Sequence, residues 1–357
     1  MNKLNRKVTV LGAGSSGMAT AAYLTLSGCC VTLCDTVEQA VDFDIIRKQG
    51  GIILRGGSGK TGCSLPYRMT NDFSEALQES TCVIVCTSAA RHREIAEKIA
   101  PLAQAGQKFL LSPGNFGSFI FRRLLNENGK QDVLVAELSG NLWACRRTAP
   151  GEVLVAMPLK EGTIAALPAA DTQQVIDAFQ GILALKAGKN VLEVSLNSPN
   201  VISHVAGAVL NATQVERKGN EFAFFQDGLG EAVIHSFICL ESERDAVMNK
   251  LGLSVYGASS EGLMRKLMDP ECPESLHFFR SLDGPSSFSH RYVSEDAACG
   301  VAMIVSLGKQ YEVPTPLTES FLTIAQSING ADYFQNGCTL QNVGLSDLSV
   351  TQLLASL

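Results

Sequence analysis

The sequence predicts an α/β fold, in which a doubly wound parallel sheet is followed by an all-helical domain. Three features carry this prediction. Short apolar runs rich in β-branched residues alternate with segments of helical spacing up to about residue 190, a glycine-rich turn follows the first run, and long amphipathic segments begin after residue 191. The runs are continuously apolar, which is typical of strands buried on both faces of a parallel sheet. We therefore expect two domains, at residues 1–190 and 191–357.

The individual elements follow from the hydrophobic spacing. Strands are expected at residues 8–11, 31–34, 83–86, 109–112, 133–136 and 153–157. Helical spacing between them predicts helices at 18–27, 37–49, 73–78, 92–102 and 118–126. In the second half, the predicted helices span 201–215, 229–251, 295–311 and 317–328.

Composition excludes several classes of protein. The 357 residues are 46% hydrophobic and 18% charged, as expected of a soluble chain with a large core. The formal net charge of −6 argues against a nucleic-acid partner, because binding to the phosphate backbone requires an excess of cations. No uninterrupted apolar stretch approaches the roughly 18 residues of a membrane span, so no membrane partner is expected either.

Eleven cysteines are present, an odd number without a CxxC pair. This pattern predicts neither a disulfide framework nor a metal site. Five of the cysteines lie in apolar runs, where a thiol packs as a small hydrophobic group: Cys29, Cys30, Cys34, Cys82 and Cys86. Unpaired cysteines in such number indicate a reducing, cytoplasmic location.

The turn after the first strand has the spacing GxGxxG and opens a helix. Gly12 makes the tight turn, Gly14 lets a pyrophosphate approach the backbone, and Gly17 lets the helix pack closely on the strand. Ser15 and Ser16 stand between these glycines, where the helix amino terminus attracts an anion. The strand–turn–helix context predicts a Rossmann-type dinucleotide site.

Asp35 ends the second strand, 18 residues after Gly17, where an acid is expected to bind the adenosine ribose hydroxyls. The residues after Asp35 are Thr-Val-Glu-Gln, which include no Arg or Lys to receive a 2′-phosphate. NAD(H) is therefore favoured, and NADP(H) stays open.

Two further strand ends are expected to contact the cofactor along the carboxyl edge of the sheet. One contains Thr87 and Ser88, and the other contains Pro113 and Asn115. Since loops follow strands in any fold, an ordinary connecting role is the alternative.

A helix start in the second half carries the first candidate catalytic group. Ser198 is expected to cap this helix, with Pro199 at its first position. Asn200 and His204 are four residues apart and so lie on one helix face, where a His could protonate a carbonyl and an amide could orient the substrate. A helical His satisfied by a local hydrogen bond is the alternative.

A second group of polar residues follows at 290–296. Arg291 offers a planar fork for a carboxylate, and Asp296 could hold an imidazole in one tautomer. Ser294 is expected to cap a helix that begins at Glu295. A surface ion pair between Arg291 and Asp296 is the competing interpretation.

The chain resembles the octopine/nopaline (opine) dehydrogenase family along almost its whole length. The resemblance rests on the glycine-rich turn and on shared motifs, namely Pro113-Gly114, Cys145-Arg146, Asn200-x-x-x-His204, Gly284-Pro285, Arg291-Tyr292-x-x-Glu295-Asp296, Val313-Pro-Thr-Pro-Leu317 and Thr339-Leu-x-x-x-Gly344-Leu-Ser346.

This resemblance implies reductive condensation of a pyruvate-like 2-oxo acid with an amino acid, using NADH. By resemblance, His204 and Asp296 form the catalytic pair and Arg291 binds the oxo-acid carboxylate, while Asn200 would orient the substrate. The implied partners are these two small molecules, with a homodimer as the expected assembly.

Two other functions stay open. A ketone reductase of the ketopantoate reductase or glycerol-3-phosphate dehydrogenase type would use a catalytic Lys, but no Lys occurs between Lys189 and Lys218. A non-catalytic NADH sensor would need no acid–base pair.

Overall fold

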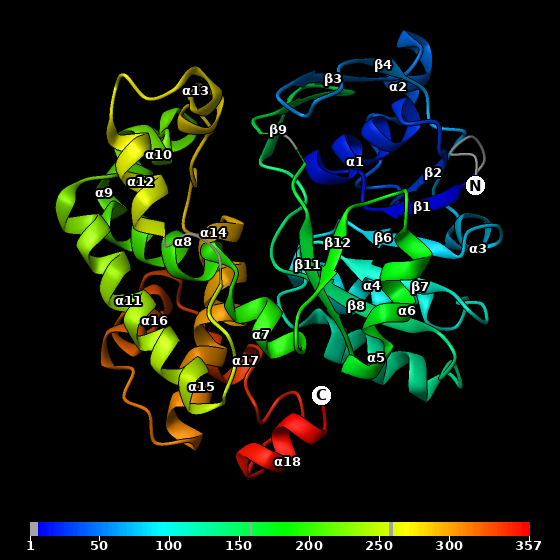
Figure 1. Cartoon of the computed structure of the whole chain (residues 1–357). Helices are drawn as coiled ribbons and strands as arrows, with labels where there is room; N and C mark the ends of the chain where they lie inside the picture. Colours follow the sequence, from blue (N-terminus) through cyan, green and yellow to red (C-terminus); the bar gives the residue numbers. More distant parts are fainter. Residues whose placement is uncertain (1–5, 158, 257–259) are drawn as a thin grey trace. The chain divides into compact units, whose positions relative to one another are not determined.

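The computed structural model describes residues 6–157, 159–256 and 260–357 (Figure 1). The chain divides into two compact units, Met1–Val191 and Leu192–Leu357. Each unit has its own architecture, and the α/β class expected for the chain is confirmed by the first.

An eight-stranded sheet forms the centre of the first unit, in the order β12-β11-β8-β7-β6-β1-β2-β5. Its strands are β1 (Lys7–Leu11), β2 (Cys30–Cys34), β5 (Arg68–Thr70), β6 (Cys82–Val85), β7 (Lys108–Leu111), β8 (Leu134–Leu138), β11 (Gly162–Ala166) and β12 (Leu185–Ala187). All neighbours are parallel except β8 and β11. Strand order reverses at β1, and in doubly wound sheets ligands bind beside the carboxyl end of such a strand.

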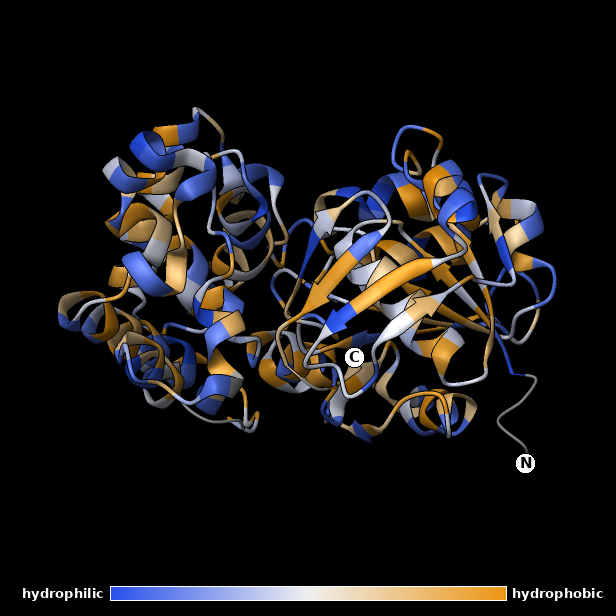
Figure 2. Cartoon of the chain, turned by 90° about the horizontal axis from the view of Figure 1, so that it is seen from above, coloured by the Kyte–Doolittle hydropathy of each residue, from blue (hydrophilic) through white to orange (hydrophobic). Residues whose placement is uncertain are grey.

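Helices cover both faces of this sheet. On one face, α1 (Ser15–Leu26) and α6 (Thr172–Phe179) contribute Met18 and Phe179 to a core with the strands. On the other, α3 (Phe73–Leu77), α4 (His92–Ile99) and α5 (Gly117–Glu127) enclose a second core. The largely hydrophobic strands visible in Figure 2 reflect this burial on two sides.

A second, four-stranded sheet packs on the other side of α1. Its order is β4 (Gly62–Ser64), β3 (Ile52–Gly56), β10 (Glu152–Val155) and β9 (Cys145–Ala149). The run at 153–157, expected in the main parallel sheet, instead forms β10, so that prediction of its place is wrong. Its side chains alternate between buried and half-buried because only one face of this small sheet meets the core.

The expected helix at 37–49 is only partly present. The structure forms α2 (Phe43–Gln49), whereas residues 37–42 form a turn. Val37 and Val41, whose spacing suggested a longer helix, are 70% and 62% exposed and therefore contribute little to the core.

The second unit is built from helices. They are α7 (Val191–Leu196), whose first residue closes the first unit, α8 (Pro199–Leu210), α9 (Ala212–Lys218), α10 (Phe224–Asp227), α11 (Glu231–Lys250), α12 (Ser260–Met268), α13 (Glu274–Arg280), α14 (Arg291–Asp296), α15 (Ala302–Gln310), α16 (Pro316–Asn329), α17 (Tyr333–Asn336) and α18 (Val350–Ala355). Buried α8 packs against α11, α14 and α16, which makes it the centre of the unit.

Two predicted helices are interrupted. The helix expected at 201–215 breaks at Asn211, whose amide donates to the carbonyls of Gly207 and Gly228 and so ends α8. The helix expected at 295–311 begins earlier, at Arg291, and contains a π-helical segment, Ala297–Val301, before α15. Ser294 is therefore not the cap; His290 is, and its ring accepts a hydrogen bond from the backbone N–H of Tyr292.

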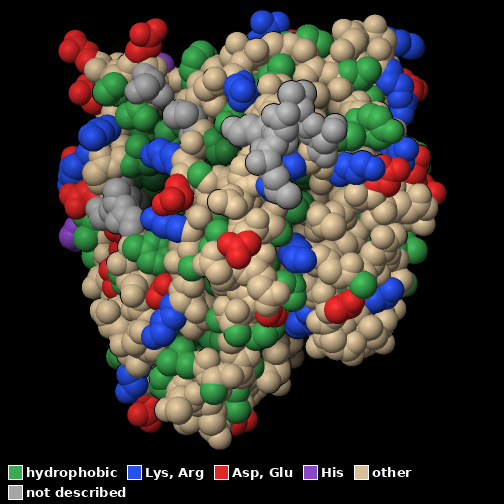
Figure 3. Space-filling view, turned by 45° about the vertical axis from the view of Figure 1, so that its right-hand side comes forward, with side chains coloured by type: hydrophobic (Ala, Val, Ile, Leu, Met, Phe, Trp, Pro, Cys, Tyr) green, Lys and Arg blue, Asp and Glu red, His purple; other side chains and the backbone are tan. Residues whose placement is uncertain are grey.

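No helix among the described residues is both long enough and apolar enough to cross a membrane. The face drawn in Figure 3 carries Lys and Arg side chains interspersed with Asp and Glu side chains.

Candidate active site

The glycine-rich turn has the shape that a dinucleotide requires. Gly12 has a φ of 107°, and a Cβ there would lie 2.9 Å from the carbonyl carbon of Cys86. A Cβ on Gly17 would overlap the carbonyl oxygen of Gly12, so only glycine lets α1 approach β1 this closely. At Gly14 a Cβ would meet nothing within 4 Å, which leaves open space in front of the first turn of α1.

The N-cap residue of α1 is Gly14, which has no side chain to cap the backbone N–H groups of the first turn. Such groups and the helix dipole attract a phosphate. Strand β9 passes the same turn, where the backbone N–H of Arg147 donates to Oγ of Ser15 over 3.1 Å. The residues present therefore fit the pyrophosphate of a dinucleotide.

Asp35 stands at the end of β2, beside this turn, and its side chain is 2% exposed. Its carboxylate accepts hydrogen bonds from the backbone N–H of Ala13 at 2.7 Å and of Thr36 at 2.8 Å. The guanidinium of Arg91 lies beside the same carboxylate, with Nη2 3.0 Å from Oδ1. The residues that follow Asp35 in the sequence include no cation, but the tertiary fold supplies Arg91 from the 3-10 turn Ala89–Arg91.

The two other predicted strand ends lie in loops at the carboxyl edge of the main sheet. Thr87 and Ser88 follow β6, and Ser88 is the residue before a short 3-10 turn that leads into α4. Pro113 and Asn115 follow β7, and Asn115 adopts a φ of 47°, in the left-handed region that Asn tolerates better than most residues.

Buried Glu137, at the end of β8, holds the loop after β7. Its carboxylate accepts the backbone N–H of Phe116 at 3.1 Å and of Ser118 at 2.7 Å. A Cβ on Gly114 would come within 2.5 Å of Cβ of Glu137, so the loop lies directly on this side chain. Glu137 thereby caps α5 and fixes the loop that carries Pro113 and Asn115.

In the second unit, α8 and α14 bring the predicted catalytic pair together. Nδ1 of His204 lies 2.7 Å from Oδ2 of Asp296, and both side chains are buried. The partner of Nδ1 is therefore a carboxylate on another helix, 92 residues away in the chain. A carboxylate at Nδ1 orients the ring and favours the charged imidazolium.

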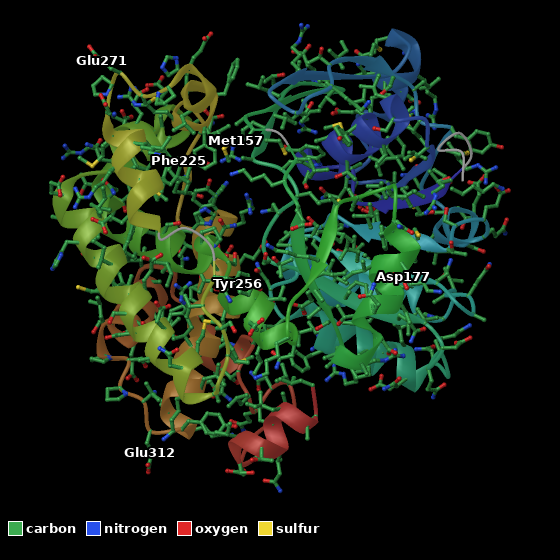
Figure 4. The ribbon with its side chains drawn as sticks, in the orientation of Figure 1. Met157, Asp177, Phe225, Tyr256, Glu271 and Glu312 are labelled. Carbon is green, nitrogen blue, oxygen red and sulfur yellow. The ribbon has the colours of Figure 1, made fainter. Side chains whose placement is uncertain are left out.

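Aromatic side chains enclose the imidazole. The ring of Tyr292 stacks on that of His204, with centroids 3.5 Å apart and planes at 8°. Phe224 meets the same imidazole edge-on at 6.3 Å, and its neighbour Phe225, labelled in Figure 4, packs against Phe279. His204 is therefore held in one orientation by packing as well as by Asp296.

Burial governs the charge of the pair. It raises the pKa of Asp296 to about 7, while the positive charge of Arg291 acts in the opposite direction. Arg291 itself is half-buried, and its guanidinium lies 5.4 Å from the ring centroid of Tyr292. The positive charge of Arg291 therefore acts on the His204–Asp296 pair, and a site that binds a carboxylate needs such a cation.

The start of α8 is fixed from outside the helix. Asn197 donates from Nδ2 to the carbonyl of Ser254 at 2.9 Å and accepts the N–H of Tyr256 at 2.9 Å (Figure 4 labels Tyr256). Ser198 is the N-cap residue and Pro199 begins the helix, both as expected, although the side chain of Ser198 makes no capping hydrogen bond. Asn200 is half-buried on the first turn of α8.

Three residues around the candidate cofactor and catalytic sites are not predicted from the sequence: Arg91, Glu137 and Tyr292. A charged residue inside an apolar strand was the available signal for Glu137, and adjacency to Arg291 was the signal for Tyr292. Within the described parts of the chain, no group of three His, Cys, Asp or Glu side chains is placed to hold a metal ion.

Each half of the chain matches a family model. The model for ketopantoate reductase PanE/ApbA matches residues 8–112. Residues 187–329 match the model for the NAD/NADP octopine/nopaline dehydrogenase, alpha-helical domain.

Individual proteins are similar over the full length. An opine dehydrogenase from Arthrobacter sp. (strain 1C) is 31% identical across 97% of this chain and 97% of its own. Protein ocs from Agrobacterium tumefaciens (strain Ach5) is 20% identical across 98% and 99%.

Solved structures share the fold at lower identity. Octopine dehydrogenase with NADH and L-arginine has a TM-score of 0.72 at 18% identity, over 99% of this chain and 98% of the other. Yersinopine dehydrogenase with NADP+ bound has a TM-score of 0.67 at 15% identity, over 99% and 98%.

Proposed function

Because the chain belongs to the octopine/nopaline (opine) dehydrogenase family, and is therefore an oxidoreductase that acts on CH–NH bonds with NAD or NADP, we propose that it condenses a pyruvate-like 2-oxo acid with an amino acid. The observation that carries this proposal is the buried His204–Asp296 pair. A protein that only sensed NADH would have no use for such a pair.

The reaction begins when the amino nitrogen attacks the ketone carbon of the oxo acid. Water then leaves, and a C=N double bond forms. When bound, the nicotinamide would supply a hydride to the imine carbon, while the imine nitrogen takes up a proton, which gives the secondary amine.

His204 moves the protons of this condensation. In its charged form it donates to the ketone oxygen, which polarises the carbonyl and lets the oxygen leave as water. Asp296 holds the imidazole by Nδ1 and so directs Nε2 toward the substrate. Because the pair is buried, its interaction with the developing charge is stronger than it would be in water.

Arg291 and Asn200 position the substrates in this proposal. The fork of Arg291 matches a carboxylate in a bidentate arrangement, which fixes the face of the ketone that is reduced. Asn200 lies one helical turn before His204 and would orient the same molecule through its amide.

Residues of the first unit would hold the cofactor. The open space at Gly14 and the amino terminus of α1 suit its pyrophosphate, and the carboxylate of Asp35 suits the adenosine ribose. We propose that Thr87, Ser88, Pro113 and Asn115 contact it along the sheet edge, and that NADH is preferred because a carboxylate disfavours a 2′-phosphate.

A matrix of substrates tests the function. The purified protein is given NADH, one of pyruvate, oxaloacetate or 2-oxoglutarate, and one of the common amino acids, and NADH consumption is followed at 340 nm. We expect oxidation only when both substrates are present, with an N-(carboxyalkyl) amino acid detected by mass spectrometry.

Two results would contradict the proposal. Reduction of an oxo acid at full rate without an amine would indicate a ketone reductase. This is the alternative function, and it is the one named by the family model that matches residues 8–112. NADH binding without turnover in every combination would indicate a sensor.

Location and assembly are part of the same proposal. All eleven cysteines have free thiols, which suits the reducing conditions of a cytoplasm. We also propose a homodimer, which size-exclusion chromatography with light scattering would detect as twice the mass of the chain.

A further inference from the structure

Arg91 places a cation at the point where the fold is expected to bind the adenosine ribose. Its Nη2 lies 3.0 Å from Oδ1 of Asp35, and Nη1 lies 3.5 Å from Oδ2. The Arg91 side chain is 22% exposed, whereas the Asp35 side chain is 2% exposed. Arg91 therefore reaches the buried carboxylate from the solvent side.

Asp35 does not need Arg91 to stabilise its charge. The backbone N–H groups of Ala13 and Thr36 each donate to a different oxygen of the carboxylate, at 2.7 and 2.8 Å. Hydrogen bonds of this kind, from backbone donors to an ionised acceptor, are strong. Arg91 can thus turn away from Asp35 without leaving a buried charge uncompensated.

Arg91 is also tethered on its other side. Its Nε donates to Oε2 of Glu94 at 2.9 Å, one turn later in α4, and Nη2 lies 3.4 Å from Oε1 of the same residue. Glu38 and Lys98 contribute further charges around this group. Two carboxylates therefore hold one guanidinium at the mouth of the ribose site.

This arrangement has opposite consequences for the two nicotinamide cofactors. The ribose hydroxyls of NADH must share the oxygens of Asp35 with Arg91. The 2′-phosphate of NADPH would be repelled by Asp35 alone, but a guanidinium is the side chain best suited to pair with a phosphate.

We propose that Arg91 is the specificity-determining residue that lets the cofactor site accept a 2′-phosphate, while Asp35 favours the unphosphorylated ribose. The inference rests on the proposed cofactor site. Contact with Arg91 would let the chain use NADPH as well as NADH. The ion pair between Arg91 and Glu94 would compete with the 2′-phosphate for the guanidinium and weaken NADPH binding.

Binding of two fragments tests the role of Arg91 without requiring turnover. Isothermal titration calorimetry compares 5′-AMP with 2′,5′-ADP (adenosine 2′,5′-bisphosphate), which differ only by the 2′-phosphate. For Arg91→Ala we expect the affinity for 2′,5′-ADP to fall by about tenfold or more, because a charge-assisted phosphate contact is lost, with the affinity for 5′-AMP kept within about threefold.

Two matched variants accompany this measurement. Arg93→Ala removes the same charge from an exposed position two residues later, on α4, and it should change neither affinity. Glu94→Gln releases Arg91 from one carboxylate and should raise the affinity for 2′,5′-ADP several-fold. The ratio of kcat/KM for NADPH to that for NADH should move in the same direction as the fragment affinities in every variant.

The outcomes separate this inference from the proposed function. If wild type binds 5′-AMP but Arg91→Ala changes both affinities equally, or neither, Arg91 has no part in cofactor choice. Wild type that binds 5′-AMP but not 2′,5′-ADP overturns the inference as well. If neither fragment nor NADH binds, the cofactor site itself is wrong. If Arg91→Ala does not fold, the Glu94→Gln variant tests the inference. An affinity of Glu94→Gln for 2′,5′-ADP equal to that of wild type would overturn it.

Discussion

Nδ1 of His204 lies 2.7 Å from Oδ2 of Asp296, although the two residues are 92 positions apart in the chain. Helix α8 carries the first and α14 the second, and these helices pack directly against each other. Neither side chain is exposed by more than 5%. The pair is thus a product of the helical core of the second unit.

Removal of His204 should abolish catalysis without affecting cofactor binding. We expect His204→Ala to lower kcat by about 10³-fold, the range for loss of a general acid. The dissociation constant for NADH, measured by fluorescence titration, should stay within about twofold of wild type, because Asp35 and the glycine-rich turn belong to the other unit. His235→Ala, on the exposed face of α11, serves as control. Loss of NADH binding in His204→Ala would show that His204 is structural.

The His204–Asp296 pair should also determine how the reaction rate depends on pH. Because burial raises the pKa of Asp296 to about 7, the pair keeps a proton near neutral pH. Reductive condensation needs that proton as an acid, so its rate should fall as the pH rises past the ionisation of the pair. The reverse reaction needs the pair as a base, and its rate should rise over the same range. Measurement of kcat against pH for the forward and the reverse reaction tests this prediction. If both rates rise, or both fall, over this pH range, the prediction is wrong.

How far the sequence predicts the site depends on whether the signal is local. The glycine-rich turn and Asp35 belong to one strand–helix–strand unit, and His204 with Asn200 to one helix, so spacing makes them candidates. The catalytic role of His204 comes only from the resemblance to the family. Arg91 reaches Asp35 from a segment 56 residues away, and no spacing rule connects them. The strand β10 was placed in the wrong sheet for the same reason, because an apolar run does not specify its partner strands.

Two glycines of the turn should separate folding from binding. In Gly17→Ala the new Cβ overlaps the Gly12 carbonyl, so α1 must shift and the free energy of unfolding should fall by about 3 kcal/mol. Gly14→Ala meets no atom of the protein and should change stability by less than about 1 kcal/mol. Both variants should lose NADH affinity, Gly14→Ala because its methyl group occupies the space for the pyrophosphate. Urea unfolding and NADH titration measure the two effects, and a Gly14→Ala variant that binds NADH normally would place the pyrophosphate elsewhere.

Glu137 should matter through the loop that it holds. Glu137→Gln replaces one acceptor oxygen by an amide that faces a backbone N–H, which should cost about 2 kcal/mol of unfolding free energy. NADH affinity should fall as well if the loop of Pro113 and Asn115 contacts the cofactor. Glu127→Gln, an exposed change on α5, is the control. Reduced stability with unchanged NADH affinity would limit Glu137 to a structural role.

His92 should make the first unit sensitive to acid. Burial lowers the pKa of His92 to about 4, from an ordinary value of 6.5. Between these values the unfolded chain takes up a proton that the folded chain does not, so the free energy of unfolding falls as the pH falls, by about 3 kcal/mol in all. Above pH 6.5 this contribution is fully present, and it is lost progressively toward pH 4.

Urea unfolding at several pH values between 7 and 4.5 measures the effect. His92→Gln removes the titrating group, so its unfolding free energy should decline less steeply with acid than that of wild type, whatever its value at pH 7. His235→Gln, at an exposed position, should keep the wild-type slope. If His92→Gln and wild type lose stability in parallel, the proton taken up on unfolding binds to another group, and His92 is not responsible for the acid sensitivity.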